Sequence, residues 1–398
     1  MKKSFTLAAA AVLAIGALSA QAQIVVDGTL TAAEIGVAGS GKYVLIGKYT
    51  NPRGFGDWGL MSLYAANTGT KIHFFVGGTV QNNASGSNSL QLFLDLPGVT
   101  GASASPVALP APVGTGTSFA GMVAKMDIAP DLGLAIKGNG SGIGAAAGTI
   151  VPQAVSYTSA TVAVDRDLAP ELPNSGVATP IAATSTTGAF VRLTGARMAY
   201  KNTTTGDITT NPGNTSPNTG ATYGAAGSFG WEIELDRTAL GLTGLGAIGV
   251  FVLQNNGGGD YLSSDFIPQT PNPLTTNNGN LTNANTVDFA TITGTQRATF
   301  NVVALGTKAA DEASVAMNVY PNPAEGSAIV AYNVAGRSEK VSIVLTDLLG
   351  RSVQVLENGL QSAGVQTTKV NTANVGAGTY LVRVQVGEKV AVRKVVLL

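Results

Sequence analysis

The sequence contains no cysteine and a single histidine among its 398 residues. The lack of cysteine excludes disulfides, thiolate zinc sites, iron–sulfur clusters and cysteine nucleophiles. Charged residues are also scarce, at 12 % against about 25 % in an ordinary soluble protein. Basic and acidic residues balance at 23 each. With no block of basic residues, the chain lacks the electrostatic character of a nucleic-acid-binding protein.

Glycine is abundant instead, with 51 residues, and 44 % of the chain is hydrophobic. This composition supplies enough apolar mass for a packed core and favours strands and turns over helices. Apolar residues alternate with their neighbours at 72–76, 90–94 and 231–235, as in strands. A continuous apolar run at 248–253 predicts a strand buried on both faces. We therefore predict an all-β protein.

Residues 1–22 have the pattern of a secretory signal peptide. Two lysines give a basic start, an apolar stretch runs to Leu18, and Ala20-Gln21-Ala22 fits a cleavage site. The apolar stretch is shorter than the roughly 20 residues that a membrane span requires. We therefore expect export through the Sec translocon, a mature chain starting at Gln23, and no transmembrane segment in that chain.

A different pattern begins near residue 315 and continues to residue 398. Alternating apolar runs separated by turn residues predict about seven short strands in a small immunoglobulin-like antiparallel β-sandwich. The motifs in this stretch are, in chain order, Tyr320-Pro321-Asn322-Pro323, Asp347-Leu348-Leu349-Gly350-Arg351, Gly378-Thr379-Tyr380-Leu381-Val382-Arg383-Val384 and Val392-Arg393-Lys394-Val395-Val396. In sequence and order they resemble the type A C-terminal sorting domain of the type IX secretion system of Bacteroidota.

This resemblance implies a partner and a destination. It implies passage from the periplasm through the type IX secretion machinery, followed by release from the cell or attachment to the outer-membrane surface. The residues that would carry the sorting signal are Tyr320, Pro321, Asn322, Pro323, Asp347, Gly350, Gly378, Tyr380, Arg393 and Lys394.

The chain upstream of the sorting domain reads as one cargo domain. Small polar residues at 307–314 predict a linker between a cargo domain at 23–306 and the sorting domain at 315–398. Residues 23–312 hold 13 basic and 18 acidic residues and are therefore mildly acidic, at −5. We expect a large, jelly-roll-like β-sandwich with long loops. Residues 118–200 form either insertions in this sandwich, which we favour, or a separate subdomain.

The order of strand motifs in the cargo domain also has a counterpart among known families. The motifs are Val26-Asp27-Gly28-Thr29-Leu30, Lys71 to Gly78, Asn88 to Asp95 and Gly230-Trp231-Glu232-Ile233-Glu234-Leu235. They resemble family 9 carbohydrate-binding modules and related DOMON-type sandwiches. The resemblance implies binding of a glycan or a similar small ligand, such as a polysaccharide, in some members with structural calcium.

Candidate binding residues fall in two loop regions. Sugar binding needs flat aromatic faces beside polar groups, which makes Trp58, Tyr49 and Tyr261 candidates. Asn256, Asp260 and Asp265 gather oxygen ligands of the kind that calcium prefers, although they lack the fixed spacing of a calcium loop, and a plain hairpin turn explains the same residues.

Other candidates have a structural explanation at least as good. The alternation places Trp231 on the apolar face of its strand, and Glu232 and Glu234 together on the opposite, solvated face. A carboxylate pair of this kind serves glycoside hydrolysis, but any solvated strand has the same spacing. His73 with Met61 could ligate haem, yet a lone strand histidine is more often simply exposed.

The favoured interpretation is a secreted or surface protein, exported by type IX secretion, with a non-catalytic, glycan-binding-like cargo domain. No nucleophile motif, phosphate loop or dinucleotide fingerprint occurs, so we do not predict an enzyme. The alternative is a structural or adhesive matrix component without a small-molecule ligand.

Overall fold

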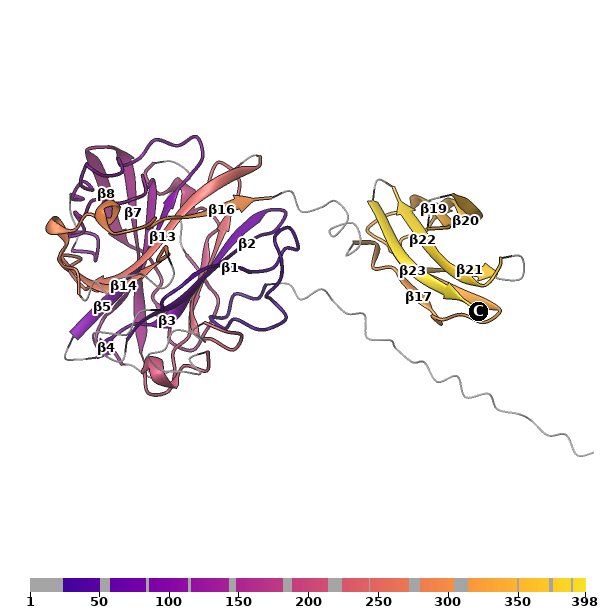
Figure 1. Cartoon of the computed structure of the whole chain (residues 1–398), viewed down its shortest axis with the longest axis horizontal. Coiled ribbons are helices and arrows are strands. Elements are labelled where there is room, and N and C mark those ends of the chain that lie inside the picture. Colours follow the sequence, from indigo (N-terminus) through magenta and orange to yellow (C-terminus); the bar gives the residue numbers. More distant parts are fainter. Residues whose placement is uncertain are drawn as a thin grey trace, which may run out of the picture. The chain divides into compact units, whose positions relative to one another are not determined.

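A computed structural model describes most of the chain. The described residues are 24–50, 58–83, 86–113, 116–142, 148–181, 188–213, 224–242, 244–271, 280–303, 314–348, 351–371, 375–387 and 389–398. The chain divides into two compact units, Gln23–Gly306 and Thr307–Leu398, each built of strands (Figure 1). The predicted signal peptide and all but the last residue of the predicted linker lie outside the described residues. Within those residues, no helix has the length and hydropathy to cross a membrane.

The first unit contains a six-stranded antiparallel sheet. Its strands, in spatial order, are β1 (Val44–Lys48), β2 (Gly59–Asn67), β3 (Lys71–Thr79), β12 (Gly230–Asp236), β11 (Arg197–Tyr200) and β10 (Thr179–Pro180). The pairing of β3 with β12 joins segments far apart in the sequence, with Trp231 opposite Val76 and Glu232 opposite Phe75.

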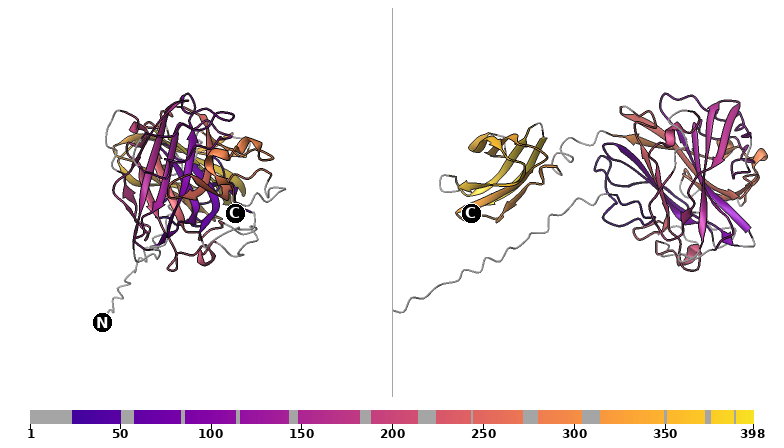
Figure 2. Two further views of the ribbon diagram at one scale, coloured as in Figure 1. Left: turned by 90° about the vertical axis from the view of Figure 1, so that its left-hand side faces the viewer. Right: turned by 180° about the vertical axis from the view of Figure 1, so that it is seen from behind.

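A second, ten-stranded sheet faces the first (Figure 2). Its main path runs β15 (Thr282–Asn283), β14 (Tyr261–Ile267), β13 (Gly246–Asn256), β5 (Gly86–Asp95), β6 (Leu132–Gly138), β7 (Thr149–Ser159) and β8 (Val162–Asp167), and β16 (Ala298–Val302), β4 (Asn82–Asn83) and β9 (Leu172–Pro173) pair at its sides. Strands β6 to β8 continue the sheet from β5. Residues 132–167 are therefore part of the sandwich and not a separate subdomain.

The main core lies between the two sheets and follows the predicted alternation. Ile72 and Phe74 of β3, Trp231 and Ile233 of β12, and the leucines of β5 all contribute to it. Trp231 is fully buried, which confirms its prediction as a core residue. Strand β13 is buried on both faces, as the apolar run at 248–253 predicted.

Both sheets are also covered on their outer faces. Residues of the first segment, including Ile24, Leu30 and Tyr43, pack on Tyr64 and Phe75 of the six-stranded sheet. Residues between 102 and 128, together with Ala284–Phe289, cover the outer face of the ten-stranded sheet. These covering segments are largely irregular, so the sequence periodicity that predicts strands could not reveal them.

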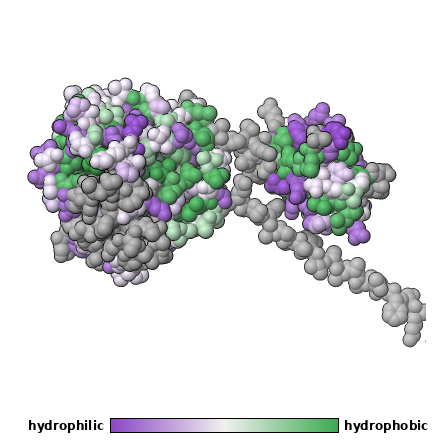
Figure 3. Space-filling view, in the orientation of Figure 1, coloured by the Kyte–Doolittle hydropathy of each residue, from purple (hydrophilic) through white to green (hydrophobic). Residues whose placement is uncertain are grey.

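The second unit is a smaller antiparallel sandwich. Its described strands number seven, in agreement with the prediction: β17 (Asn318–Tyr320), β18 (Ser327–Val334) and β21 (Gly364–Asn371) form one sheet, and β20 (Ser352–Gln361), β19 (Glu339–Thr346), β22 (Gly378–Val386) and β23 (Lys389–Leu397) form the other. Hydrophobic residues from both sheets meet in one core. Apolar side chains also reach its surface on β20 and β21, where Leu360 and Val365 are exposed, and hydrophobic and hydrophilic residues alternate over this unit (Figure 3).

Candidate functional site

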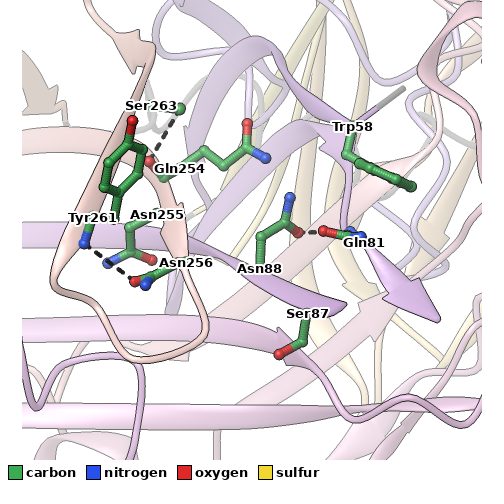
Figure 4. A pocket seen from close by; sticks show the side chains of 9 residues that line it. All are labelled: Trp58, Gln81, Ser87, Asn88, Gln254, Asn255, Asn256, Tyr261 and Ser263. Carbon is green, nitrogen blue, oxygen red and sulfur yellow. Dashed lines mark hydrogen bonds between the residues drawn. The ribbon is translucent and has the colours of Figure 1, made fainter. Parts of the chain in front are cut away.

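A cavity of about 290 Å³ lies at one end of the first unit. Residues at or beside the ends of β2, β3, β5, β13 and β14 line it, so both sheets contribute. The lining residues are Trp58, Gln81, Ser87, Asn88, Gln254, Asn255, Asn256, Tyr261 and Ser263. The described lining is therefore aromatic or uncharged and polar throughout. In Figure 4, Trp58 and Tyr261 lie on opposite sides of this space, with Asn88 and Gln254 between them.

The local sequence explains why amide side chains lie at the cavity. Along β13, Val250 and Val252 point into the main core, and Gln254 takes the next position on the same face. Along β5, Asn88 precedes Leu90 and Leu92 in the same way. Each strand thus replaces an apolar residue by an amide where the core ends.

Several hydrogen-bonding groups of the cavity are left free. The side-chain amide of Gln254 makes no hydrogen bond with the described part of the chain, although the residue is only 6 % exposed. Asn88 accepts a hydrogen bond from the main-chain N–H of Gln81 at 2.6 Å. The Oγ of Ser263 donates to the main-chain carbonyl of Gln254 at 3.2 Å. The free amide groups can therefore hydrogen-bond a polar ligand in the cavity.

The loop between β13 and β14 forms one rim of the cavity and is held from behind. The main-chain N–H of Gly121 donates to the carbonyl of Gly258 at 2.9 Å. Gly259 has φ +81°, and a Cβ there would lie 2.0 Å from the carbonyl oxygen of Ser118. Ser118 is itself fixed by Gln91, whose Nε2 donates to its carbonyl at 2.7 Å. The covering segment around residue 118 therefore positions the rim.

Of the three aromatic residues proposed as sugar platforms, the structure brings two to the cavity. Trp58 and Tyr261 line it, and Tyr261 is 37 % exposed. The prediction for Tyr49 is wrong, because this residue is fully buried in the main core. Its hydroxyl lies 3.2 Å from the Oγ of Ser264. Tyr49 follows an edge strand whose inward face the sequence did not identify.

The three residues proposed for calcium do not form one set. Asn256 Nδ2 donates to Asp260 Oδ1 at 2.6 Å, across the turn. Asp265 lies four residues along β14 from its first residue, is buried, and accepts a hydrogen bond from the main-chain N–H of Leu60 at 2.9 Å. Within the described residues, no group of three acidic or histidine side chains is placed to hold a metal ion. The turn and the strand each explain these residues without calcium.

The expected solvated face of β12 is buried. Glu232 is fully buried under the first segment, where its carboxylate accepts hydrogen bonds from the main-chain N–H groups of Asp27 (2.9 Å) and Gly28 (3.0 Å) and from the hydroxyl of Tyr43 (2.7 Å). Burial raises the pKa of Glu232 to about 8, against the effect of these donors.

Glu234 has a different environment on the same face. It accepts two hydrogen bonds of 2.8 Å from Arg197. Although burial acts to raise it, these bonds hold the pKa of Glu234 below its usual value. Glu232 and Glu234 are therefore structural and do not form a hydrolytic pair at a cleft.

His73 is buried too, and not exposed as expected. It is 3 % exposed, its ring packs edge-on at 6.4 Å from that of Tyr43, and burial lowers its pKa to about 4. Met61 instead lies in the core between the sheets. The two side chains are on different faces and do not form a haem site.

Several of the residues predicted to carry the sorting signal join distant parts of the second unit. Asn322 Nδ2 donates to the carbonyl of Lys394, and the N–H of Val396 donates to Asn322 Oδ1, both at 2.9 Å, so the first motif binds the last strand. Asp347 accepts hydrogen bonds from the N–H and Nε of Arg351, at 2.9 and 2.6 Å, closing a turn.

The remaining residues predicted for the sorting signal lie at turns and on strands of the same unit. The hydroxyl of Tyr380 donates to the carbonyl of Gly376 at 2.8 Å, and Gly378 begins β22 against the Tyr380 ring. Tyr320 is 45 % exposed at the end of β17, and Pro321 and Pro323 flank Asn322. Arg393 and Lys394 lie on β23; Gly350 is outside the described residues.

Sequence reasoning missed most of the cavity. It did not single out Gln81, Asn88, Gln254 or Ser263, although Asn88 and Gln254 carry a detectable signal: an amide at a position where the strand alternation expects an apolar residue. Gln81 and Ser263 lie where no sequence pattern distinguishes them from ordinary polar residues near a strand end.

The comparisons with known proteins assign the second unit and leave the first unassigned. No curated protein matches the chain. Among solved structures, dimeric latent PorU from Porphyromonas gingivalis is 12 % identical over 82 % of this chain, which spans 31 % of PorU, with a TM-score of 0.18. The BSP domain of a biofilm-associated protein is 7 % identical over 95 % of this chain and 84 % of its own, also with a TM-score of 0.18.

One family model does match, and it matches where the four sequence motifs lie. Residues 318–398 fit the model of the secretion system C-terminal sorting domain. Strands β17 to β23 and the hydrogen bonds of Asn322, Asp347 and Tyr380 lie within this match. Residues 318–398 are thus a C-terminal sorting domain, and the protein is a cargo of the type IX secretion system, exported to the cell surface or the extracellular space.

Proposed function

We propose that the first unit binds a carbohydrate, without hydrolysing it, in the cavity between Trp58 and Tyr261. The observation that carries the proposal is the pairing of two aromatic side chains, far apart in the sequence, across a cavity whose other described lining side chains are amides and hydroxyls.

This combination matches the chemistry of a sugar ring. The C–H groups of a sugar form apolar faces that pack against aromatic rings, and its hydroxyls both donate and accept hydrogen bonds. Trp58 and Tyr261 offer such rings, and Gln254 and Asn88 offer amides. The resemblance of the strand motifs to carbohydrate-binding modules points in the same direction.

The size of the cavity limits the ligand. At about 290 Å³ it lies near the lower end of the range for small-molecule sites, roughly 300–1,000 Å³. A short stretch of a glycan, with the remainder of the chain outside, fits this volume.

Binding without hydrolysis follows from the lining. Hydrolysis of a glycosidic bond requires two carboxyl groups beside it, and the described lining residues carry none. The buried acids of β12 lie on the outer face of the six-stranded sheet, under the first segment of the chain. We therefore propose a binding protein.

Truncation of either aromatic residue tests the proposal. We expect Trp58→Ala and Tyr261→Ala each to weaken retention of the full chain on its polysaccharide by at least about fivefold, because a stacking contact worth roughly 1 kcal/mol or more is lost. Retention on a panel of insoluble polysaccharides identifies the ligand. Affinity electrophoresis then gives the ratio of each variant's affinity to that of the unaltered chain.

Tyr320→Ala is the matched control, because Tyr320 is exposed to a similar degree but lies in the sorting domain. Its retention should equal that of the unaltered chain. Failure of the unaltered protein to bind any polysaccharide would contradict the proposal and favour the structural or adhesive role.

A further inference from the structure

We propose that this cavity selects uncharged saccharides and rejects acidic ones, and that Asn88 and Gln254 determine this selectivity. The inference rests on the proposed carbohydrate binding. It concerns which sugars bind, and therefore makes predictions that carbohydrate binding alone does not.

Asn88 presents a donor of fixed direction. Its Oδ1 accepts the main-chain N–H of Gln81 at 2.6 Å, and a main-chain N–H can only donate. The amide therefore cannot turn over without losing this bond, and Nδ2 must point away from Gln81. In Figure 4 this nitrogen points into the space between Gln254 and Trp58. Asn88 is 8 % exposed, and its Nδ2 has no partner within the described residues.

Gln254 and Ser263 supply hydrogen-bond acceptors that complement the donor of Asn88. The Oγ of Ser263 donates to the carbonyl of Gln254 and accepts from the main-chain N–H of Asp265 at 3.0 Å, which leaves one lone pair as an acceptor. The Gln254 amide, free of partners in the described structure, offers one donor group and one acceptor. All three residues can form hydrogen bonds with a ligand whose neighbouring groups each both donate and accept a hydrogen bond. Adjacent hydroxyls of a sugar ring are such groups.

A carboxylate or sulfate has no comparable partner here. No basic side chain lines the cavity among the described residues. The charge on the rim loop is Asp260, whose Oδ1 accepts the hydrogen bond from Asn256. An anionic sugar would lose its hydration without gaining a cation from the described lining residues, which is strongly unfavourable. An uncharged sugar avoids this cost.

The test compares ligands of equal length that differ in charge. Isothermal titration of the full chain with neutral gluco-, manno-, xylo- and chitin oligosaccharides, and with oligogalacturonate and alginate oligomers, gives the selectivity. We expect one or more neutral oligosaccharides to bind and the uronates to bind at least tenfold more weakly. Equal or tighter uronate binding would overturn the inference while leaving carbohydrate binding intact.

Substitution of each amide by the acid of the same shape tests the role of Asn88 and Gln254. Asn88→Asp keeps the oxygen that accepts from Gln81 but replaces the Nδ2 donor by a charged oxygen, and Gln254→Glu does the same at the second amide. We expect each to weaken neutral-sugar binding by about 10- to 100-fold. Asn301→Asp, an exposed change on β16 at the far end of β13, is the control and should bind as the unaltered chain does.

The outcomes separate the two proposals. Unchanged neutral binding by Asn88→Asp and Gln254→Glu, together with loss of binding by Trp58→Ala, would overturn the selectivity inference alone. Absence of binding to every neutral and acidic ligand would overturn the proposed function and the inference with it.

Discussion

Glu232 joins the first segment of the chain to β12 through three hydrogen bonds in a fully buried environment. Its partners are two main-chain N–H groups and the hydroxyl of Tyr43, none of which carries a positive charge. Burial therefore dominates, and with a pKa raised to about 8 the side chain stays protonated at neutral pH in the folded protein. In the unfolded chain the same group would ionise near pH 4.5.

This difference gives the stability a defined dependence on pH. Between pH 4.5 and 8 the folded protein retains a proton that the unfolded chain releases, so the free energy of unfolding falls as pH rises. From pH 6.5 to 8 we expect a loss of about 1–2 kcal/mol from this group. The opposing effect of His73, with its pKa of about 4, falls mostly below pH 6.5, and only about 0.4 kcal/mol of it remains above that pH.

Glu232→Gln mimics the protonated side chain and should remove most of this slope. Urea unfolding at pH 6.5, 7.2 and 8 measures it. Glu234→Gln, on the same face but paired with Arg197, should lower stability and keep the slope. An unaltered slope in Glu232→Gln would show that another group titrates.

The same residues show where sequence reasoning failed. It predicted exposure for His73, Glu232 and Glu234 because they alternate with core residues, and alternation normally separates a buried face from a solvated one. Here the first segment covers the second face as well. A long-range cover of this kind leaves no mark on the strand's own sequence.

At the level of elements, the ten-stranded sheet depends on irregular segments for its outer surface. Phe289, in the short 3₁₀ turn η4 (Phe289–Thr291), packs with its ring centroid 4.8 Å from that of Phe251 and 5.4 Å from that of Phe266. It is 1 % exposed. The turn thus holds two strands, β13 and β14, from outside.

We expect Phe289→Ala to lower the free energy of unfolding by about 3–5 kcal/mol, because it leaves a cavity beside the rings of Phe251 and Phe266. Chemical unfolding followed by intrinsic fluorescence measures the change. Val113→Ala, at a residue 87 % exposed in the other covering segment, should change stability by less than about 0.5 kcal/mol. Similar effects from both variants would contradict the role of η4.

Most strands of both units could be predicted because their two-residue period is a local property. The seven strands of the sorting domain and the strands that contain Phe74, Leu92 and Ile233 agree with the structure. The cavity could be predicted only in part, since it is assembled from five strand ends. Trp58 and Tyr261 were found from their chemistry, whereas Asn88 and Gln254 acquire meaning only when the sheets face each other.

At the level of the whole molecule, the chain combines a cargo unit with a sorting domain that carries its own core. We expect a chain lacking residues 314–398 to remain inside the outer membrane, because it lacks the signal that the type IX machinery recognises. Immunoblots of cells and medium measure its distribution.

Two controls accompany this deletion. Gln366→Ala, a substitution on β21 of the sorting domain, should leave export unchanged. The unfolding midpoint of the retained cargo unit should match that of the full chain's first unit, which excludes misfolding as the cause. Export of the shortened chain at the normal level would refute the requirement.

The bond between Asp27 and Glu232 also bears on the order in which the chain folds. It joins residues 205 positions apart. Strand β3 likewise pairs with β12, which lies far along the sequence. A chain synthesised from its N-terminus therefore carries its first segment unpaired until more than half of its length has appeared. Folds dominated by such distant pairings acquire their structure slowly, so the first segment of the cargo unit is expected to reach its buried position late in folding.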